Sequence, residues 1–449
     1  RTKLQLSASI DRTFNQSLRL KYGVRGTIDR QRNFKQVKDL LSGGEFEDID
    51  FFLVDDDTQS NMLLNHLNHP ARKIGQSDRY GYDYALTECH LSLFSEIKYT
   101  TDRLKVDGYL SLGNSTARRR GYYRKEFFAA NSFGRSKLLS FADCAAHLAV
   151  QYSPSRQHHI SASAAAIFRP TEAQNLFLQS EYNNLSVNNP RLTSLLSASA
   201  TYHLTLNSFW LRTSLFARYH ARQTDVAHAY YDAASEYADI VTSDLATLAT
   251  GIEVEAQYSI NNHLSMAAGV TYGRYRYAGS PTVAVYADKD NRLLASTSSL
   301  LRGCRGNTPA LTLYGDVEYR SANGWTASLA ATYWGMRYVD PAFAHRSVRV
   351  LSSASSPEER AMLTTQERLP DDVMIDIGGG KSFKFRTGQR LYLHLALRNI
   401  LGSETISRGY EQNRVSRQTI GGVQHVTPFA NRLSYAYPRT IYLSVGVSF

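Results

Sequence analysis

Acidic residues gather near residues 45–57 and are the first candidates for binding an ion. Asp48 and Asp50 precede the run Asp55-Asp56-Asp57. Carboxylate oxygens are the hard ligands that Ca²⁺ prefers, so the cluster could bind calcium. The segment has neither the turn glycine nor the closing glutamate of a twelve-residue calcium loop. A solvated acidic loop is therefore the favoured interpretation.

Histidine and cysteine offer further metal chemistry. His66 and His69 lie close in sequence, as do His158 and His159, and imidazole is a common ligand of metals and haem iron. Loop histidines without a metal are the favoured alternative. Three cysteines, odd in number and far apart, give neither a disulfide framework nor a zinc spacing: Cys89, Cys144 and Cys304. We predict no metal and no cofactor.

Basic residues cluster at the end of one predicted strand: Arg118, Arg119, Arg120, Arg124 and Lys125. Guanidinium groups match phosphate geometry, so this rim could bind lipopolysaccharide phosphate or an anionic substrate. A solvated basic rim is the alternative. The net charge of +11 is otherwise spread over strand ends and loops. No aromatic-basic motif accompanies it, and nucleic acid is not an expected partner.

Acid–base or nucleophilic catalysis would need a positioned pair or a nucleophile motif. Four carboxylates fall on the polar side of predicted strands: Glu253, Glu255, Asp316 and Glu318. We interpret them as a hydrated lumen wall that could steer a cationic solute, and not as catalytic pairs. No Gly-x-Ser-x-Gly nucleophile motif is present, so we predict that the protein is not an enzyme.

The end of the chain shows which elements carry these side chains. One parity of the last strand is entirely apolar: Ile441, Leu443, Val445, Val447 and Phe449. The other parity holds small, hydroxylated or amphipathic residues, which is the two-residue period of a strand with two different faces. In a transmembrane barrel the apolar face meets lipid, and a terminal aromatic side chain suits the membrane interface. The last strand of a soluble sandwich is the alternative.

Composition agrees with a barrel. Charged residues make up 20% of the 449, and the mean hydropathy is −0.36. No apolar run of the ~18 residues needed for a membrane helix occurs. A barrel strand needs only ~9–11 residues with half of them apolar, so it escapes such a search. Twenty-nine tyrosines against three tryptophans suit interfacial girdles, although a tyrosine-rich soluble binding module would show the same count.

Seven hairpins and one closing strand repeat the alternation. The hairpins are predicted at 3–15 with 18–30, 82–100 with 104–123, 139–152 with 159–168, 195–204 with 210–222, 252–260 with 264–272, 311–319 with 325–333, and 373–377 with 391–397. The closing strand is predicted to start near Leu433. Turns within hairpins are short, as at Ala322-Asn323-Gly324.

The other connections are long and polar: 33–80, 124–138, 170–194, 225–243, 279–308, 340–372 and 402–432. Strict alternation of short turns and long loops is typical of outer-membrane barrels. We therefore predict an all-β, antiparallel, up-and-down transmembrane barrel.

The strand count predicts that this barrel is larger than the chain. About fifteen strands are present, whereas bacterial single-chain barrels have an even number, and a 22-stranded barrel holds a plug. The first and last strands run in the same direction. The chain also begins at Arg1 without a secretory signal. We expect residues 1–449 to be the C-terminal portion, with the first strands and plug elsewhere and no pairing of the last strand with residues 3–14.

Several short segments resemble the TonB-dependent outer-membrane transporters, in particular the branch with a carboxypeptidase-regulatory-like domain ahead of the plug. The segments are Leu67-Asn68-His69-Pro70 with Gly81-Tyr82-Asp83-Tyr84, Asn131-Ser132-Phe133-Gly134-Arg135-Ser136, Phe168-Arg169-Pro170 with Asn189-Pro190-Arg191-Leu192, Gly378-Gly379-Gly380-Lys381-Ser382, Arg398-Asn399-Ile400-Leu401 and Gly409-Tyr410-Glu411-Gln412. Their order and spacing together carry the resemblance.

The resemblance implies uptake of a large or scarce solute across the outer membrane with energy from TonB. It implies contact with outer-membrane lipid and lipopolysaccharide, with the TonB complex through the missing N-terminal part, and with a surface lipoprotein as a further candidate. Haem transporters of this superfamily place a histidine within the stretch corresponding to 171–188, which has none here. A passive porin-like barrel, or a structural barrel of an envelope complex, is the alternative function.

Overall fold

The computed structural model describes residues 1–41, 43–51 and 60–449, and most of them belong to one antiparallel sheet. Fifteen long strands of this sheet pair in chain order: β1 (Thr2–Thr13), β2 (Leu18–Gln36), β5 (Arg79–Thr100), β6 (Leu104–Gly121), β8 (Leu139–Tyr152), β9 (His158–Pro170), β10 (Leu192–Thr205), β11 (Phe209–Tyr231), β12 (Glu236–Ser259), β13 (Leu264–Tyr277), β16 (Leu311–Arg320), β17 (Trp325–Gly335), β18 (Asp372–Lys384), β19 (Arg390–Arg398) and β24 (Thr440–Ser448). The predicted all-β fold and the number of strands are confirmed.

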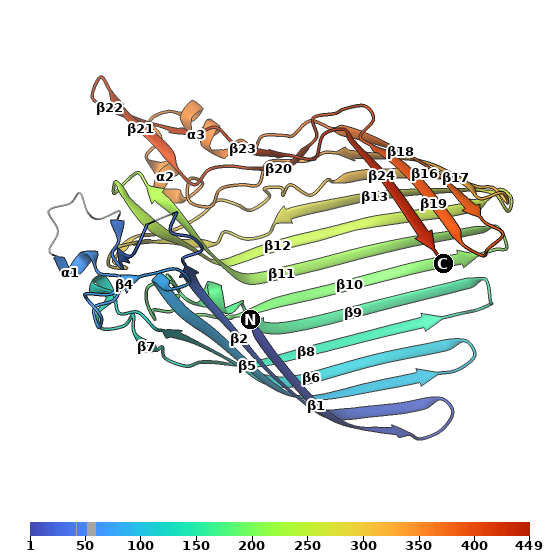
Figure 1. The fold of residues 1–449 in the computed structure, drawn as a ribbon, viewed down its shortest axis with the longest axis horizontal. Coiled ribbons are helices and arrows are strands. Elements are labelled where there is room, and N and C mark those ends of the chain that lie inside the picture. The colour runs from blue at the N-terminus through green and yellow to red at the C-terminus, as the bar shows by residue number, and fades with distance from the viewer. Residues whose placement is uncertain (42, 52–59) are drawn as a thin grey trace.

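The two ends of the sheet differ as predicted (Figure 1). Short turns join the strands of each hairpin at one end, and the long connections gather at the other. The long connections carry short elements: β3 (Phe46–Glu47), α1 (Ser60–Leu63), β4 (Lys73–Ile74), η2 (Glu126–Phe128), β7 (Gly134–Arg135), η3 (Ala173–Leu176), β14 (Thr282–Ala287), β15 (Leu293–Ser298), α2 (Val348–Ser352), α3 (Pro357–Thr364), β20 (Ile406–Tyr410), β21 (Val415–Ile420), β22 (Val423–Pro428) and β23 (Arg432–Tyr435). None of the described helices is long and apolar enough to cross a membrane.

The sheet has two unpaired edges. Among the described residues, β1 pairs with β2 alone and β24 pairs with β19 alone. The last strand therefore does not pair with residues 3–14, as the strand count predicted. Free edges expose backbone donors and acceptors, and a bilayer does not tolerate such groups.

Three predicted boundaries are wrong at the loop end. Residues 225–243 were expected to form a loop, but β11 and β12 continue through most of them because Ala238, Ile240 and Val241 are buried. The connection 279–308 contains a hairpin, β14–β15, which extends the sheet beside β12. The closing strand begins at Thr440 and not near Leu433.

Proline explains the later start of the closing strand. Residues 432–435 form β23, which pairs with β20 in a separate small sheet. Pro438 follows, and proline has no backbone N–H to donate to a ladder. The chain can therefore join the large sheet only beyond this residue.

One face of the sheet carries an apolar band in continuous register. Leu443 lies opposite Leu395 at one edge, and Ile28 lies opposite Leu4 at the other. The apolar residues of β24 are more than half exposed: Ile441 69%, Leu443 67%, Val445 60%, Val447 56% and Phe449 95%. So much exposed apolar surface needs a cover, and lipid is the cover that the sequence predicts.

Candidate functional site

The opposite face of the same strands is polar and carries the main candidate site. At the first four strands, Asp29 lies opposite both Lys3 and Glu88, and His90 lies opposite Ser115. Two-residue alternation places these side chains on the face opposite the apolar band. They line a cavity of about 470 Å³.

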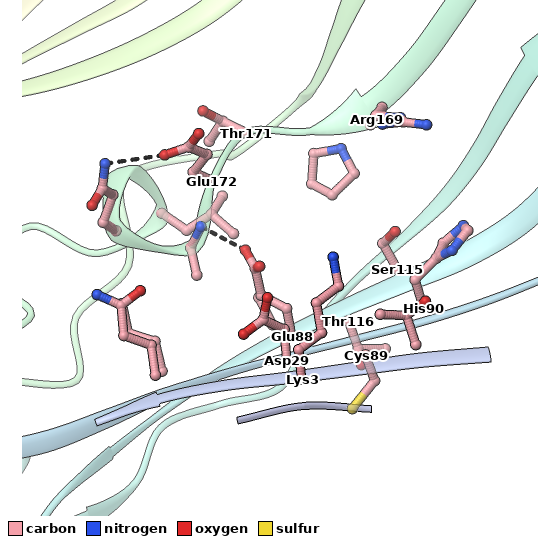
Figure 2. A pocket seen from close by; sticks show the side chains of 18 of the residues that line it. Lys3, Asp29, Glu88, Cys89, His90, Ser115, Thr116, Arg169, Thr171 and Glu172 are labelled. Atoms are coloured by element: carbon pink, nitrogen blue, oxygen red, sulfur yellow. Dashed lines mark hydrogen bonds between the residues drawn. The ribbon is translucent and has the colours of Figure 1, made fainter. Parts of the chain in front are cut away.

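A loop forms the roof of this cavity (Figure 2). The connection after β9 turns at Pro170 and enters the short helix η3, whose Ala173 N–H donates to Glu88 Oε1 at 2.8 Å. Leu176 and Phe177 behind it are buried against β5 and β6. The roof is therefore fixed by one carboxylate and an apolar cluster.

Charges in the cavity are paired across the strands. Asp29 accepts hydrogen bonds from Arg1 Nε at 3.0 Å and from Arg1 Nη2 at 2.6 Å. Lys3, Arg169 and Glu172 add charges of both signs to the lining. Such a mixed polar surface can hold a hydrated, charged solute through several weak contacts.

The arrangement of Ser115, Asp143 and His90 does not activate a nucleophile. Ser115 Oγ donates to Asp143 Oδ2 at 2.6 Å, and the His90 ring contacts Asp143 Oδ1 at 3.1 Å. In a catalytic triad the histidine takes the serine proton and the carboxylate orients the histidine. Here the carboxylate stands between the serine and the histidine, so these three side chains do not have the arrangement of a catalytic triad.

A second cavity of about 590 Å³ lies nearer the short-turn end, on the same polar face. Its lining includes His159, His203, Trp210, Arg212 and Glu255. Arg212 Nη2 donates to Glu255 Oε1 at 2.9 Å, so this carboxylate is already partnered.

The four carboxylates predicted for the lumen all lie on the polar face. Glu253 is opposite Ser214, and Asp316 and Glu318 are opposite Ala267 and Ser265. Glu318 Oε2 pairs with Arg320 at 3.0 Å. Two of the four carboxylates, Glu255 and Glu318, are thus paired with an arginine. That all four line a lumen stays a prediction.

The predicted metal candidates are placed in packing roles. Asp55, Asp56 and Asp57 lie outside the described residues. Asp48 accepts from Asn65 Nδ2 at 3.0 Å and pairs with Arg72 at 3.3 Å. Within residues 1–41, 43–51 and 60–449, no group of three or more His, Cys, Asp or Glu side chains could hold a metal ion.

His66 belongs to an aromatic stack. Its ring lies 5.0 Å from the Tyr123 ring and 4.8 Å from the His69 ring, measured between centroids. Burial, followed by the neighbouring charges of His69, Arg72 and Lys125, lowers the pKa of His66 to about 4. This histidine is neutral at physiological pH and acts as a packing group.

The five residues of the predicted basic rim do not form one cluster. Strand alternation sends Arg118 and Arg120 to the face of the apolar band and Arg119 to the polar face. The prediction of a basic rim is wrong for Arg119, because this residue is only 1% exposed.

The other two rim residues, Arg124 and Lys125, bond to atoms of the loops. Arg124 Nε donates to Ala129 O at 3.0 Å. The Lys125 ammonium bonds Asn65 Oδ1 and lies 5.3 Å from the centre of the Tyr182 ring. Burial lowers the pKa of Lys125 to about 8. Both residues therefore help to pack loops.

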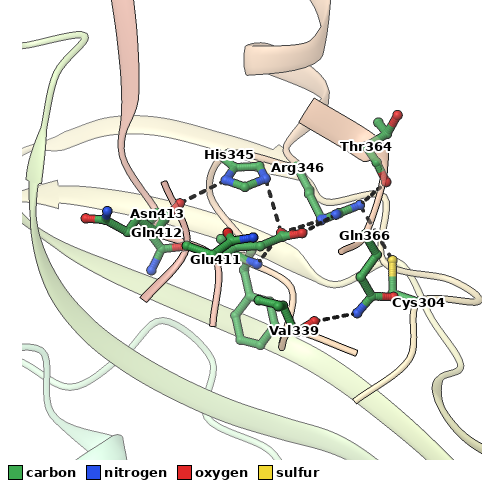
Figure 3. A network of polar contacts seen from close by, with 12 residues as sticks. Cys304, Val339, His345, Arg346, Thr364, Gln366, Glu411, Gln412 and Asn413 are labelled. Atoms are coloured by element: carbon green, nitrogen blue, oxygen red, sulfur yellow. Dashed lines mark hydrogen bonds and ion pairs between the residues drawn. The ribbon is translucent and has the colours of Figure 1, made fainter. Parts of the chain in front are cut away.

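A second network joins the C-terminal loops (Figure 3). Arg346 is 1% exposed and forms a two-pronged ion pair with Glu411, with Nε to Oε2 at 2.7 Å. Glu411 also accepts from the Ala342 N–H at 2.9 Å and contacts His345 Nε2 at 3.2 Å. Burial alone would raise the pKa of Glu411, but the bonds from Arg346 and His345 outweigh it and hold the pKa at about 2.

Sequence patterns missed the cavity residues Asp29, Glu88, His90 and Asp143. All four lie on the polar parity of predicted hairpins, so alternation could have assigned their face. Which of them meet under the loop after β9 depends on a loop conformation that no local pattern encodes.

No protein-family model and no curated protein matches the sequence. Solved structures do match. The siderophore receptor PiuA from Acinetobacter baumannii superposes with a TM-score of 0.58 at 13% identity, over 99% of this chain and 55% of that chain. The copper transporter OprC superposes with a TM-score of 0.57 at 11% identity, over 99% of this chain and 56% of that chain.

The FrpB iron transporter from Neisseria meningitidis gives a TM-score of 0.55 at 12% identity, over 99% of this chain and 54% of that chain. The chain therefore spans about half the length of the structures it matches. The similarity shows the fold: these residues form an antiparallel sheet that resembles a large part of the β-barrel in these transporters and receptors.

Proposed function

We propose that the chain is the C-terminal part of the barrel of a TonB-dependent transporter that takes up a large or scarce solute across the outer membrane. One observation carries the proposal. Nearly the whole chain superposes on about half of several such transporters and receptors, while among the described residues β1 and β24 each have only one neighbouring strand. Further strands between these edges would complete a closed barrel, and a plug within it would supply the TonB-contacting segment.

Metal complexes are the solute class that the neighbours favour. The matched proteins are described as transporters or receptors for iron, copper and siderophores. The polar wall here mixes carboxylates with arginine and lysine, as at Asp29, Glu88 and Arg169, and such a surface suits a hydrated chelate carrying charge. The carboxypeptidase-regulatory-like branch and a surface lipoprotein partner remain part of this proposal.

Uptake measurements on the full-length protein test it. The gene is expressed in a host strain that lacks other iron receptors. These cells are then offered radiolabelled ferric citrate, a ferric catecholate and a copper chelate. We expect one of these to be accumulated and the accumulation to stop when TonB is deleted. The passive barrel predicts solute entry or ion conductance that is unchanged by TonB deletion, and that result would replace our proposal.

A further inference from the structure

Arginines form two adjacent rows on the apolar-band side of β2, β5, β6 and β7. In one row Arg30 lies opposite Thr87, and Thr87 lies opposite Arg118. In the next row Arg32, Ala85, Arg120 and Arg135 lie side by side. Directly opposite residues share a face, and strands are ~4.8 Å apart, so five guanidinium groups start within ~15 Å of one another.

These rows begin where the apolar band ends. Ile28 precedes Arg30 on the same face of β2, and Leu112 is the last large apolar residue on that face of β6. A strand rises ~3.3 Å per residue and is tilted ~40° from the barrel axis, so the arginines lie roughly 30–40 Å along that axis from Leu18 and Leu104 at the short-turn end. That height is just beyond the hydrocarbon core, where lipid headgroups lie.

The charge of the rows is only partly balanced. Asp83 pairs with Arg32 at 2.6 Å and with Arg79 at 2.9 Å. Arg30 Nη2 donates to the Tyr122 hydroxyl at 2.7 Å, and Arg120 stacks 5.1 Å from the same ring.

The other arginines of the rows lack an acidic partner. In the part of the chain that the structure describes, neither Arg118 nor Arg120 nor Arg135 has an ion pair. Arg118 Nε is shielded from solvent without a hydrogen-bond partner. The two rows therefore present several unneutralised donors.

An apolar groove leads away from the arginines. Gly26 lies between Leu6 and Leu91, and its missing side chain leaves space that continues past Leu4 and Ile28. The groove holds about 360 Å³, and a Cβ built on Gly26 would meet nothing closer than Leu91 at 3.9 Å. An acyl chain fits such a dry groove, because its length can lie along the strand beneath a headgroup.

We propose that this face binds a phosphorylated lipid of the outer leaflet, with phosphate on Arg30, Arg118, Arg120 and Arg135 and an acyl chain in the Gly26 groove. Guanidinium donors bind phosphate oxygens in pairs, and desolvation at the headgroup level strengthens such bonds. The inference rests on the proposed membrane placement but not on transport.

Binding of lipid A to the full-length protein in detergent tests the proposal, with bisphosphorylated lipid A compared with its dephosphorylated form by native mass spectrometry. We expect a preference of about tenfold or more for the phosphorylated lipid. Changing all four arginines to glutamine (R30Q, R118Q, R120Q and R135Q) should abolish this preference. Four exposed arginines on turns and loops serve as the matched control, also changed to glutamine, and should leave it intact: Arg103, Arg156, Arg302 and Arg386.

Two further variables separate the sources of binding. Gly26→Leu fills the groove and should weaken lipid A binding while leaving affinity for inorganic phosphate unchanged. Equal binding of both lipid A forms, or equal binding by the quadruple variant and its control, would overturn the proposal. Because neither readout needs TonB, loss of transport in the uptake experiment would leave this result unaffected.

Discussion

Two buried arginines hold two groups of loops together by different means. One group is the pair of connections after β17 and β19, and the other is the pair of loops after β6 and β9. Arg346 and Arg119 are each 1% exposed. Arg346 meets the carboxylate of Glu411, whereas Arg119 donates to Ser180 O at 2.6 Å, to Ser132 O at 3.1 Å and to Asn184 Oδ1 at 2.6 Å. Among the described residues, Arg119 has no acidic partner. The first group depends on a charge that acid can remove, and the second depends on the shape of a cage of neutral oxygens.

Each arginine joins segments far apart in the sequence. Arg346 ties the connection after β17 to the connection after β19. Arg414 pairs with Asp232 at 2.7 Å and ties the latter connection to the turn after β11. Arg119 ties β6 to the loops after β6 and β9. These loops lie at the end of the sheet by which a solute would enter under the proposed function.

Removing the charge of Glu411 should have the largest effect. Glu411→Gln leaves Arg346 buried without its counter-charge, which costs about 3–5 kcal/mol for a buried pair. We expect residues 340–432 to lose protection from hydrogen exchange while the strands β1 to β9 keep theirs. Glu404→Gln, at an exposed position in the same connection, is the control. Unchanged protection in Glu411→Gln would show that the ion pair does not hold these loops.

Shortening the reach of Arg119 should have the next largest effect. Arg119→Lys keeps the charge, but a single ammonium cannot meet the separate carbonyls of Ser132 and Ser180, and charge-assisted bonds are worth about 1.5–3 kcal/mol each. Limited proteolysis should then cut within 126–136 and 180–184. Arg120→Lys, on the opposite face, should leave these loops intact. Equal resistance of the two variants would refute the cage.

Acid should separate the two groups of loops. The pKa of Glu411 is about 2, below its ordinary 4.5, so its stabilising contribution is complete above pH 4.5 and is lost as pH falls toward 2. Hydrogen exchange between pH 5 and pH 2 should loosen residues 405–414 before the loops around Arg119. The Glu411→Gln variant should lack this pH dependence, and its presence there would assign the effect to another group.

The smallest effect is expected at His66. Its pKa of about 4 lies below the ordinary 6.5, so the folded loop binds protons less readily than the unfolded one. Stability of residues 64–72 should therefore fall as pH drops from 6.5 to 4. His66→Phe keeps the ring against Tyr123 and should remove this dependence, which exchange rates at pH 7 and pH 5 would measure. An equal pH response in wild type and variant would contradict the assignment.

The alternation of apolar and polar residues predicted the strands of the sheet, because the residue type at each strand position indicates which face its side chain lies on. The same alternation places Arg119 on the opposite face from Arg118 and Arg120. The prediction of one basic rim overlooked this difference. The loop end was less predictable, since Arg346 and Glu411 are 65 residues apart and meet only after both connections fold. The extension of β11 and β12 likewise follows from burial by β14, which local periodicity does not encode.

The central claim is that one face of this sheet meets lipid and the other a water-filled lumen. It is tested most directly on β11, where Leu215 lies on the apolar face and Ser214 on the polar face. Nitroxide labels are placed at either position in full-length protein whose Cys89, Cys144 and Cys304 are changed to serine, and the protein is reconstituted in bilayers. We predict frequent collisions with oxygen at position 215 and with a water-soluble nickel chelate at position 214. Equal exposure of both positions to the nickel chelate would contradict the account.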